Sequence, residues 1–135
     1  MSNETPSALP ERDHALYLRD MLAFCDAVLS YTSGHDLITV VADRMRYDAT
    51  LRNLELIGEA ATHVPDSVRA LAPDIPWRQV VGTRNRLAHA YLGIEPELVW
   101  QIVERSVPSL RVQLLLLLDL VGKLNPSALG NLRGS

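Results

Sequence analysis

The sequence predicts an all-α protein, an up-and-down bundle of four long helices with one or two short ones. Apolar residues recur at steps of three and four, and no segment alternates strictly between apolar and polar residues. Aromatic residues make up only 5% of the 135 residues, whereas 47% are hydrophobic, enough for one core and too many for a disordered chain. We therefore expect a single helical domain over residues 1–124, followed by a flexible tail over residues 125–135.

Two long helices joined by a short one account for the first half of the chain. Residues 11–32 have apolar positions at helical spacing, and Gly34 is placed to end this helix because a residue there commonly needs a positive φ. Asp36 can cap the short apolar turn that follows, and Asp43 can cap the next helix. Pro65 should close that helix. Its apolar stripe consists of Leu51, Leu54, Ile57, Gly58 and Ala61.

The second half should contain one short helix and two further long ones. Residues 67–71 form the short helix. The next helix should run from Trp77 to about Tyr91 and end at Gly93. The last should run over residues 95–124.

The last helix has two unusual features. Pro108 should kink it, because proline cannot donate a backbone hydrogen bond. The five consecutive leucines at residues 114–118 cover the full helix circumference, although a surface helix needs only an apolar stripe. Either this helix is central in the monomer, or a second copy or another partner covers its outer face.

Charge and cysteine content exclude several classes of protein. The formal net charge of -3 argues against a generally basic nucleic-acid binder, so any contact with RNA needs a local patch. Cys25 is the single cysteine, which excludes an internal disulfide or a zinc ribbon, and we expect a buried thiol. The N-terminal residues lack a signal-peptide pattern, and the most apolar stretch, residues 112–121, is about half the length of a membrane span. We therefore expect a cytoplasmic protein.

One segment is chemically unusual. Residues 75–94 form the longest run without Asp or Glu, and they contain Arg78, Arg84, Arg86 and His89. Guanidinium groups bind phosphate oxygens in a bidentate manner, and histidine titrates near neutral pH. The segment therefore favours a phosphate site with proton transfer, with a solvated basic helix face as the simpler alternative.

The spacing within this segment favours a composite site. At about 100° per residue, Arg84 and His89 lie about 140° apart around a helix and do not share a face. Asn85 and His89 are four residues apart and do share one, so Asn85 can orient the imidazole or touch a substrate. A two-fold pairing of this helix would bring two arginines and two histidines into one cleft.

Residues 84–91 read Arg-Asn-x3-His-x-Tyr, which resembles the R-x4-H-x-Y motif of HEPN-domain toxins, the toxin half of HEPN/MNT toxin–antitoxin pairs. Residues 54–61, LELIGEAA, are similar to the family's L-x-I-I-G-E-A helix. Further similar segments lie at residues 77–82, 92–94 and 99–100. Thr83 and Leu92 depart from the family pattern, and neither is a reacting group.

The resemblance implies a metal-independent endoribonuclease with no cofactor. RNA supplies its own nucleophile, the 2′-OH, so the enzyme needs a proton acceptor or donor and positive charge on the transition state. His89 would move the proton, Arg84 would stabilise the phosphate, and Asn85 would position one of them. The product would be a 2′,3′-cyclic phosphate or its hydrolysed form. Arg78 and Arg86 would hold the RNA backbone or remain surface charges.

The resemblance also implies protein partners. The two half-sites would meet in the cleft of a homodimer, and a nucleotidyltransferase antitoxin would transfer AMP to Tyr91, adding negative charge to the phosphate site. Glu59 can pair with Arg84 or another arginine of the motif, or remain a solvated carboxylate. Two other functions stay open: a catalytically silent HEPN module that supports a nucleotidyltransferase, and a dimerisation domain with an incidental basic patch. The intact Arg84 and His89 pair favours the enzyme, because a scaffold needs neither.

Overall fold

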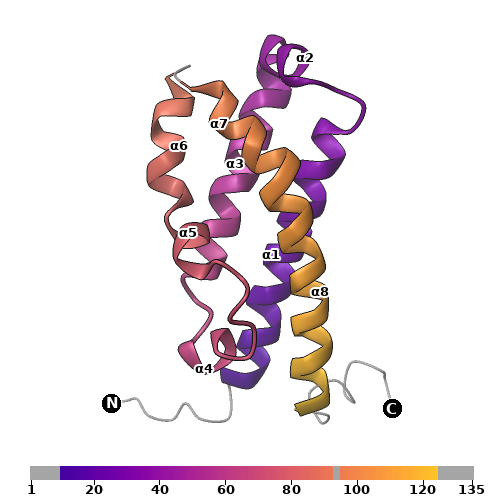
Figure 1. Ribbon diagram of the computed structural model, residues 1–135, viewed down its shortest axis with the longest axis vertical. Helices are drawn as coiled ribbons and strands as arrows, with labels where there is room; N and C mark the ends of the chain where they lie inside the picture. The colour runs from indigo at the N-terminus through magenta and orange to yellow at the C-terminus, as the bar shows by residue number, and fades with distance from the viewer. Residues whose placement is uncertain (1–9, 93–94, 125–135) are drawn as a thin grey trace.

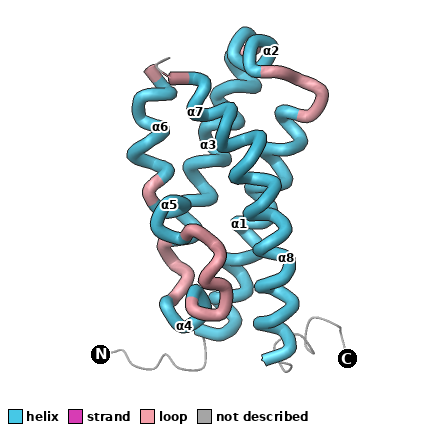
Figure 2. The backbone as a smooth tube through the Cα atoms, in the orientation of Figure 1, coloured by secondary structure: helices cyan, strands magenta, loops and turns pink. Residues whose placement is uncertain are grey.

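The computed structural model describes residues 10–92 and 95–124, apart from the side chains of residues 10–14, 89 and 90. Every regular element in this part of the chain is a helix, so the all-α prediction is confirmed (Figure 2). The helices form an up-and-down bundle (Figure 1). The longer elements are α1 (Pro10–Thr32), α3 (Arg44–Ala61), α6 (Thr83–Tyr91) and α8 (Val107–Leu124). The shorter ones are α2 (Leu37–Ala42), α4 (Asp66–Arg69), α5 (Trp77–Val81), α7 (Pro96–Gln101) and a π-helical segment η1 (Ile102–Ser106).

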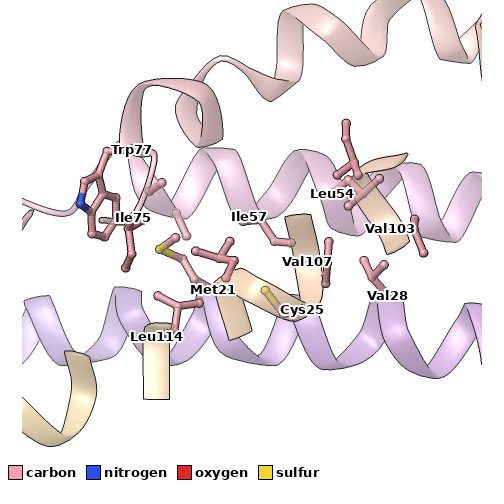
Figure 3. Packing of buried hydrophobic residues seen from close by; sticks show 14 of the residues in the cluster. Met21, Cys25, Val28, Leu54, Ile57, Ile75, Trp77, Val103, Val107 and Leu114 are labelled. Carbon is pink, nitrogen blue, oxygen red and sulfur yellow. The ribbon is translucent and has the colours of Figure 1, made fainter. Parts of the chain in front are cut away.

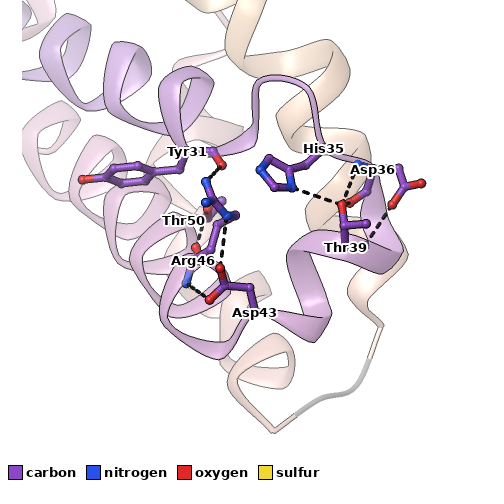
Figure 4. Close-up of polar contacts among 7 residues, drawn as sticks. All are labelled: Tyr31, His35, Asp36, Thr39, Asp43, Arg46 and Thr50. Atoms are coloured by element: carbon purple, nitrogen blue, oxygen red, sulfur yellow. Dashed lines mark hydrogen bonds and ion pairs between the residues drawn. The ribbon is translucent and has the colours of Figure 1, made fainter.

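The helix boundaries in the first half of the chain follow from local capping (Figure 4). Gly34 has a φ of 76° after α1, as predicted. The Asp36 carboxylate accepts from the Thr39 N–H at 2.9 Å, and the Asp36 N–H donates to the Thr39 hydroxyl at 3.0 Å, which completes a capping box. Asp43 caps α3 by accepting from the Arg46 N–H. Arg46 also donates to the Tyr31 carbonyl at 2.7 Å, which ties the start of α3 to the end of α1.

The hydrophobic core lies where α1, α3 and α8 meet (Figure 3). The predicted stripe of α3 is buried throughout, and α1 and α8 complete the core with residues that include Met21, Cys25, Val107 and Leu114. The prediction of a buried Cys25 is therefore confirmed. Arg111 and Asp26 form an ion pair that joins α8 to α1 at the edge of this core.

The predicted helix over residues 77–91 is divided at Gly82 into α5 and α6. The buried Thr83 hydroxyl donates to the Gln79 carbonyl at 3.0 Å, a side-chain bond of the kind that bends helices. Gly58 of α3 lies directly beneath this break, since a Cβ there would lie 2.9 Å from the Val80 carbonyl oxygen. Close packing on α3 and the Thr83 hydroxyl thus explain the division.

Two further helix ends differ in detail from the expected ones. α3 ends at Ala61 rather than at Pro65, because the Thr62 hydroxyl bonds to the Glu59 carbonyl at 2.6 Å and Thr62 closes the helix. Pro65 instead precedes α4 as its N-cap. The expected stop at Gly93 and the tail over residues 125–135 lie outside the described residues.

The disruption predicted at Pro108 is present as a π-helical turn. The segment η1 lies directly before α8, and the Val107 N–H donates to the Ile102 carbonyl, one residue further back than in an α-helix. The helix path bends between α7 and α8 (Figure 1). The widened turn accommodates Pro108, which has no N–H to donate to the Glu104 carbonyl.

The leucine run does not lie on a central helix. Leu114 and Leu117 are at most 2% exposed, whereas Leu115 and Leu116 are 42% and 67% exposed. The interpretation that the monomer buries the whole run is therefore wrong. We call the exposed side the leucine face of α8; it consists of Val112, Leu115, Leu116, Leu120 and Leu124. None of the described helices combines the length and hydropathy that spanning a membrane requires.

Candidate active site on helices α3 and α6

Helix α6 carries the Arg-x4-His-x-Tyr motif and packs against α3. Near its start, Arg84 Nη1 donates to Glu59 Oε1 at 2.8 Å, so the predicted pairing of these two residues is confirmed. Both side chains are about half exposed, at 53% and 51%. An exposed pair contributes about 0.2–1 kcal/mol of stability. The contact turns the guanidinium group toward α3 and leaves about half of the Arg84 side chain open to solvent.

Tyr91 forms the second contact between α6 and α3. Its hydroxyl donates to Glu55 Oε1 at 3.3 Å, and 42% of the residue is exposed. Arg52 donates to the same carboxylate oxygen from Nη1 at 3.0 Å. Partial burial and the Glu55 carboxylate raise the pKa of the Tyr91 hydroxyl above its ordinary value, so the phenol keeps its proton at neutral pH.

Helical spacing explains why both contacts fall on one side of α6. Arg84 and Tyr91 are seven residues apart and share a face, and Glu55 and Glu59 are four apart and share a face of α3. The two helices run in opposite directions, so the earlier carboxylate meets the later motif residue. We refer to Glu55 and Glu59 as the α3 carboxylates.

Three of the other predicted site residues on α5 and α6 are open to solvent. Arg78, Asn85 and Arg86 are exposed, and their contact with RNA stays a prediction. His89 lies on the backbone of α6, but its side chain is outside the described residues, so its role and its orientation by Asn85 also stay predictions. The helix is continuous from Thr83 to Tyr91, so the expected register of residues 84, 85 and 89 is preserved.

Acidic side chains that could hold a cation do not gather in the described residues. No group of three or more His, Cys, Asp or Glu side chains with ligand geometry is found there. The α3 carboxylates are each engaged by a motif residue.

The interpretation of the sequence missed two features of this site. Glu55 was not singled out as a partner of Tyr91, although its position four residues before Glu59, on the same face of α3, was a usable signal. The close approach at Gly58 was not foreseen either, because it depends on where α5 crosses α3.

Comparison with known proteins places these residues in a wider context. A family model described as "Ribonuclease HepT-like" matches residues 21–116. A protein of Methanocaldococcus jannaschii, provisionally named as an RNase, is 35% identical over 103 residues, which cover 76% of this chain and 94% of the relative. "Probable ribonuclease HepT" of Thermococcus cleftensis is 33% identical over 101 residues, which cover 75% of this chain and 92% of the relative. No solved structure gives a significant match.

Proposed function

The chain belongs to the HepT-like ribonuclease family, and from this premise we propose that it is a metal-independent endoribonuclease and the toxin of a toxin–antitoxin pair. The observation that carries the proposal is the placement of Arg84: its guanidinium group is turned toward Glu59 yet about half of the side chain is open to solvent, five residues before the motif histidine. A phosphate can therefore reach Arg84 by competing with one weak, exposed ion pair.

RNA cleavage at this site requires no bound metal. His89 takes the proton of the 2′-OH, and the freed oxygen attacks the adjacent phosphorus. Arg84 stabilises the additional negative charge on the phosphate oxygens. The bond from phosphorus to the 5′-oxygen then breaks, and an acid protonates that oxygen. The products are a 2′,3′-cyclic phosphate and a new 5′-OH end.

A second copy of the chain supplies the missing half of this chemistry. In one α6 helix, residues 84 and 89 lie about 140° apart, so a single helix does not present both groups from one face. Two copies of α6 facing each other across a cleft bring the acid and the base to opposite sides of one phosphate. The exposed Asn85 and Arg86 then line the cleft, and Arg78 extends its positive charge.

The decisive experiment measures cleavage of a labelled RNA by Arg84→Ala and His89→Ala variants. We expect each to lose about 100-fold or more in kcat, the range found when a transition-state donor or acid–base group is removed. Arg105→Ala, which removes an exposed arginine from η1, is the matched control. Cleavage should continue in EDTA and leave cyclic phosphate ends. Parental rates in both folded variants would refute the assignment.

We assign Tyr91 as the acceptor of AMP from a nucleotidyltransferase antitoxin. Its exposed hydroxyl lies on the same face of α6 as Arg84, so a bound adenylyl group adds negative charge where RNA must bind. Incubation with the antitoxin, ATP and Mg²⁺ should add mass in units of AMP, and Tyr91→Phe should abolish the adduct. Adduct formation on a parent that cleaves no RNA would instead favour the silent HEPN module.

A further inference from the structure

We propose that Glu55 is the positioning residue of the motif: its carboxylate anchors the C-terminal end of α6 through the Tyr91 hydroxyl, and adenylylation of that hydroxyl releases the anchor. The inference rests on the proposed function, since it concerns how the ribonuclease is assembled and switched off. In this proposal AMP inactivates the ribonuclease by breaking a contact between α3 and α6, whereas simple obstruction would only block the RNA from the site.

Among the side chains that the structure describes, the anchor and the Arg84–Glu59 pair are the polar contacts that hold α6 against α3. Arg84 meets Glu59 near the start of α6, and Tyr91 meets Glu55 at its last residue. With both contacts in place, the backbone of His89 lies between two fixed points. Buried Leu87 packs the middle of α6 into the core, so loss of the Tyr91 contact loosens the last turn of α6, which carries the backbone of His89. The separation of residues 84 and 89 across two facing copies then varies more.

The carboxylate of Glu55 is itself held in place. Arg52 donates to the same oxygen that accepts the Tyr91 hydroxyl, and the Glu55 side chain is only 27% exposed. A carboxylate with an immobilised direction is a better anchor than a freely rotating one, because less side-chain entropy is lost when the tyrosine binds. Arg52 thus supports the anchor from within α3.

Adenylylation removes the hydrogen that Tyr91 donates to Glu55 and adds a negative charge beside this carboxylate. The tyrosine oxygen forms a bond to the α-phosphorus of ATP, the bond to the β-phosphate breaks, pyrophosphate leaves, and the phenol proton is released. The modified oxygen has no hydrogen to donate. The new phosphodiester carries a negative charge next to the Glu55 carboxylate, and Asp48 is a second negative charge near Tyr91. Repulsion between like charges then moves the modified side chain away from α3.

The anchor can be tested on the full-length unmodified protein. Glu55→Ala should lower kcat for RNA cleavage by about tenfold with little change in KM, because a small misplacement of catalytic groups reduces the chemical step. Glu55→Gln keeps an acceptor oxygen and should recover part of the loss. Glu104→Gln, an exposed glutamate in η1, is the matched control. Hydrogen exchange of residues 83–91 should be faster in Glu55→Ala and unchanged in the control.

The release can be tested on the adenylylated protein. We expect AMP on Tyr91 to accelerate hydrogen exchange of residues 83–91 in the parent. We also expect adenylylated Glu55→Gln to keep a larger fraction of its own unmodified activity than the adenylylated parent keeps, because the repelling charge is absent. Equal fractional losses would overturn the release and favour obstruction by AMP.

The two proposals can fail separately. A parent that cleaves no RNA would refute the ribonuclease, while the exchange measurements would still judge the anchor. Unchanged exchange of residues 83–91 in folded Glu55→Ala would overturn the anchor even if the parent were an active ribonuclease.

Discussion

Single side chains decide whether the motif helix presents its charges in a usable direction. The exposed pair of Arg84 and Glu59 adds little to the free energy of unfolding, and it leaves about half of the Arg84 side chain open to solvent. The opposite case is Cys25, which is fully buried in the core. Burial, aided by the charge of Asp26, raises the pKa of the Cys25 thiol to about 12. Arg84 is thus accessible to a ligand, whereas Cys25 is not.

The raised pKa of Cys25 predicts that the native thiol is inert. A pH of 8 is far below the Cys25 pKa of about 12, so the thiol stays protonated. Only the thiolate form attacks disulfide reagents. We expect no reaction with Ellman's reagent in the native protein and one thiol per chain in guanidinium chloride. Rapid labelling of the native protein would show that α1 opens away from the core.

Helix α3 is the element that connects the core to the motif. Its buried stripe packs against α1, and the adjacent face supplies Glu55 and Glu59 to α6. Gly58, at the edge of the buried stripe, lies close to α5. Its missing side chain lets the Val80 carbonyl approach, which places the break at Gly82 and hence the start of α6.

Substitution Gly58→Ala should therefore disturb both stability and activity. Overpacking against the Val80 backbone costs about 1–3 kcal/mol, which outweighs the gain of up to ~1 kcal/mol in helix propensity. Urea unfolding should show net destabilisation, and RNA cleavage should fall because the start of α6 shifts.

The comparison variant is Gly34→Ala, at a positive φ with open space around it. It should cost about 1 kcal/mol through backbone strain and leave cleavage at parental rates. If Gly34→Ala reduced cleavage as much as Gly58→Ala, loss of stability alone would explain both.

The molecule as a whole has two distinct surfaces. Helix α6 with its motif and helix α8 with the leucine face lie at opposite edges of the bundle (Figure 1). Beside the leucine face, a shallow cavity of about 220 Å³ is lined by Leu71, Pro73, Ile75, Leu116 and Leu120 among others. A protein bound at the leucine face would therefore leave the motif accessible to RNA. Exposed apolar areas of this kind are typical of interaction surfaces.

Neighbouring leucines of α8 should differ strongly in their contribution to folding. Leu117 is 2% exposed, so Leu117→Ala should cost about 2–5 kcal/mol in urea unfolding. Leu116 is 67% exposed, so Leu116→Ala should change the free energy of unfolding by less than about 0.5 kcal/mol. A large cost for Leu116→Ala would mean that a second copy covers the leucine face in solution, and the cost would then grow with protein concentration.

Local sequence dictates the helical architecture, the caps at Asp36 and Asp43, the stop at Gly34, the disruption near Pro108 and the register of the motif. These features depend on residues within about one helical turn of each other, so spacing and local hydrogen bonding are sufficient to predict them. The family resemblance was likewise carried by short segments in order.

Packing between helices sets the break at Gly82, the Glu55–Tyr91 contact and the exposed side of the leucine run. Arg84 and Glu59 are 25 positions apart, and Tyr91 and Glu55 are 36 apart. A sequence pattern can suggest such partners, as it did for Arg84 and Glu59. Their meeting depends on how two helices pack, because rotation of α6 by a fraction of a turn would move both motif residues out of reach of α3.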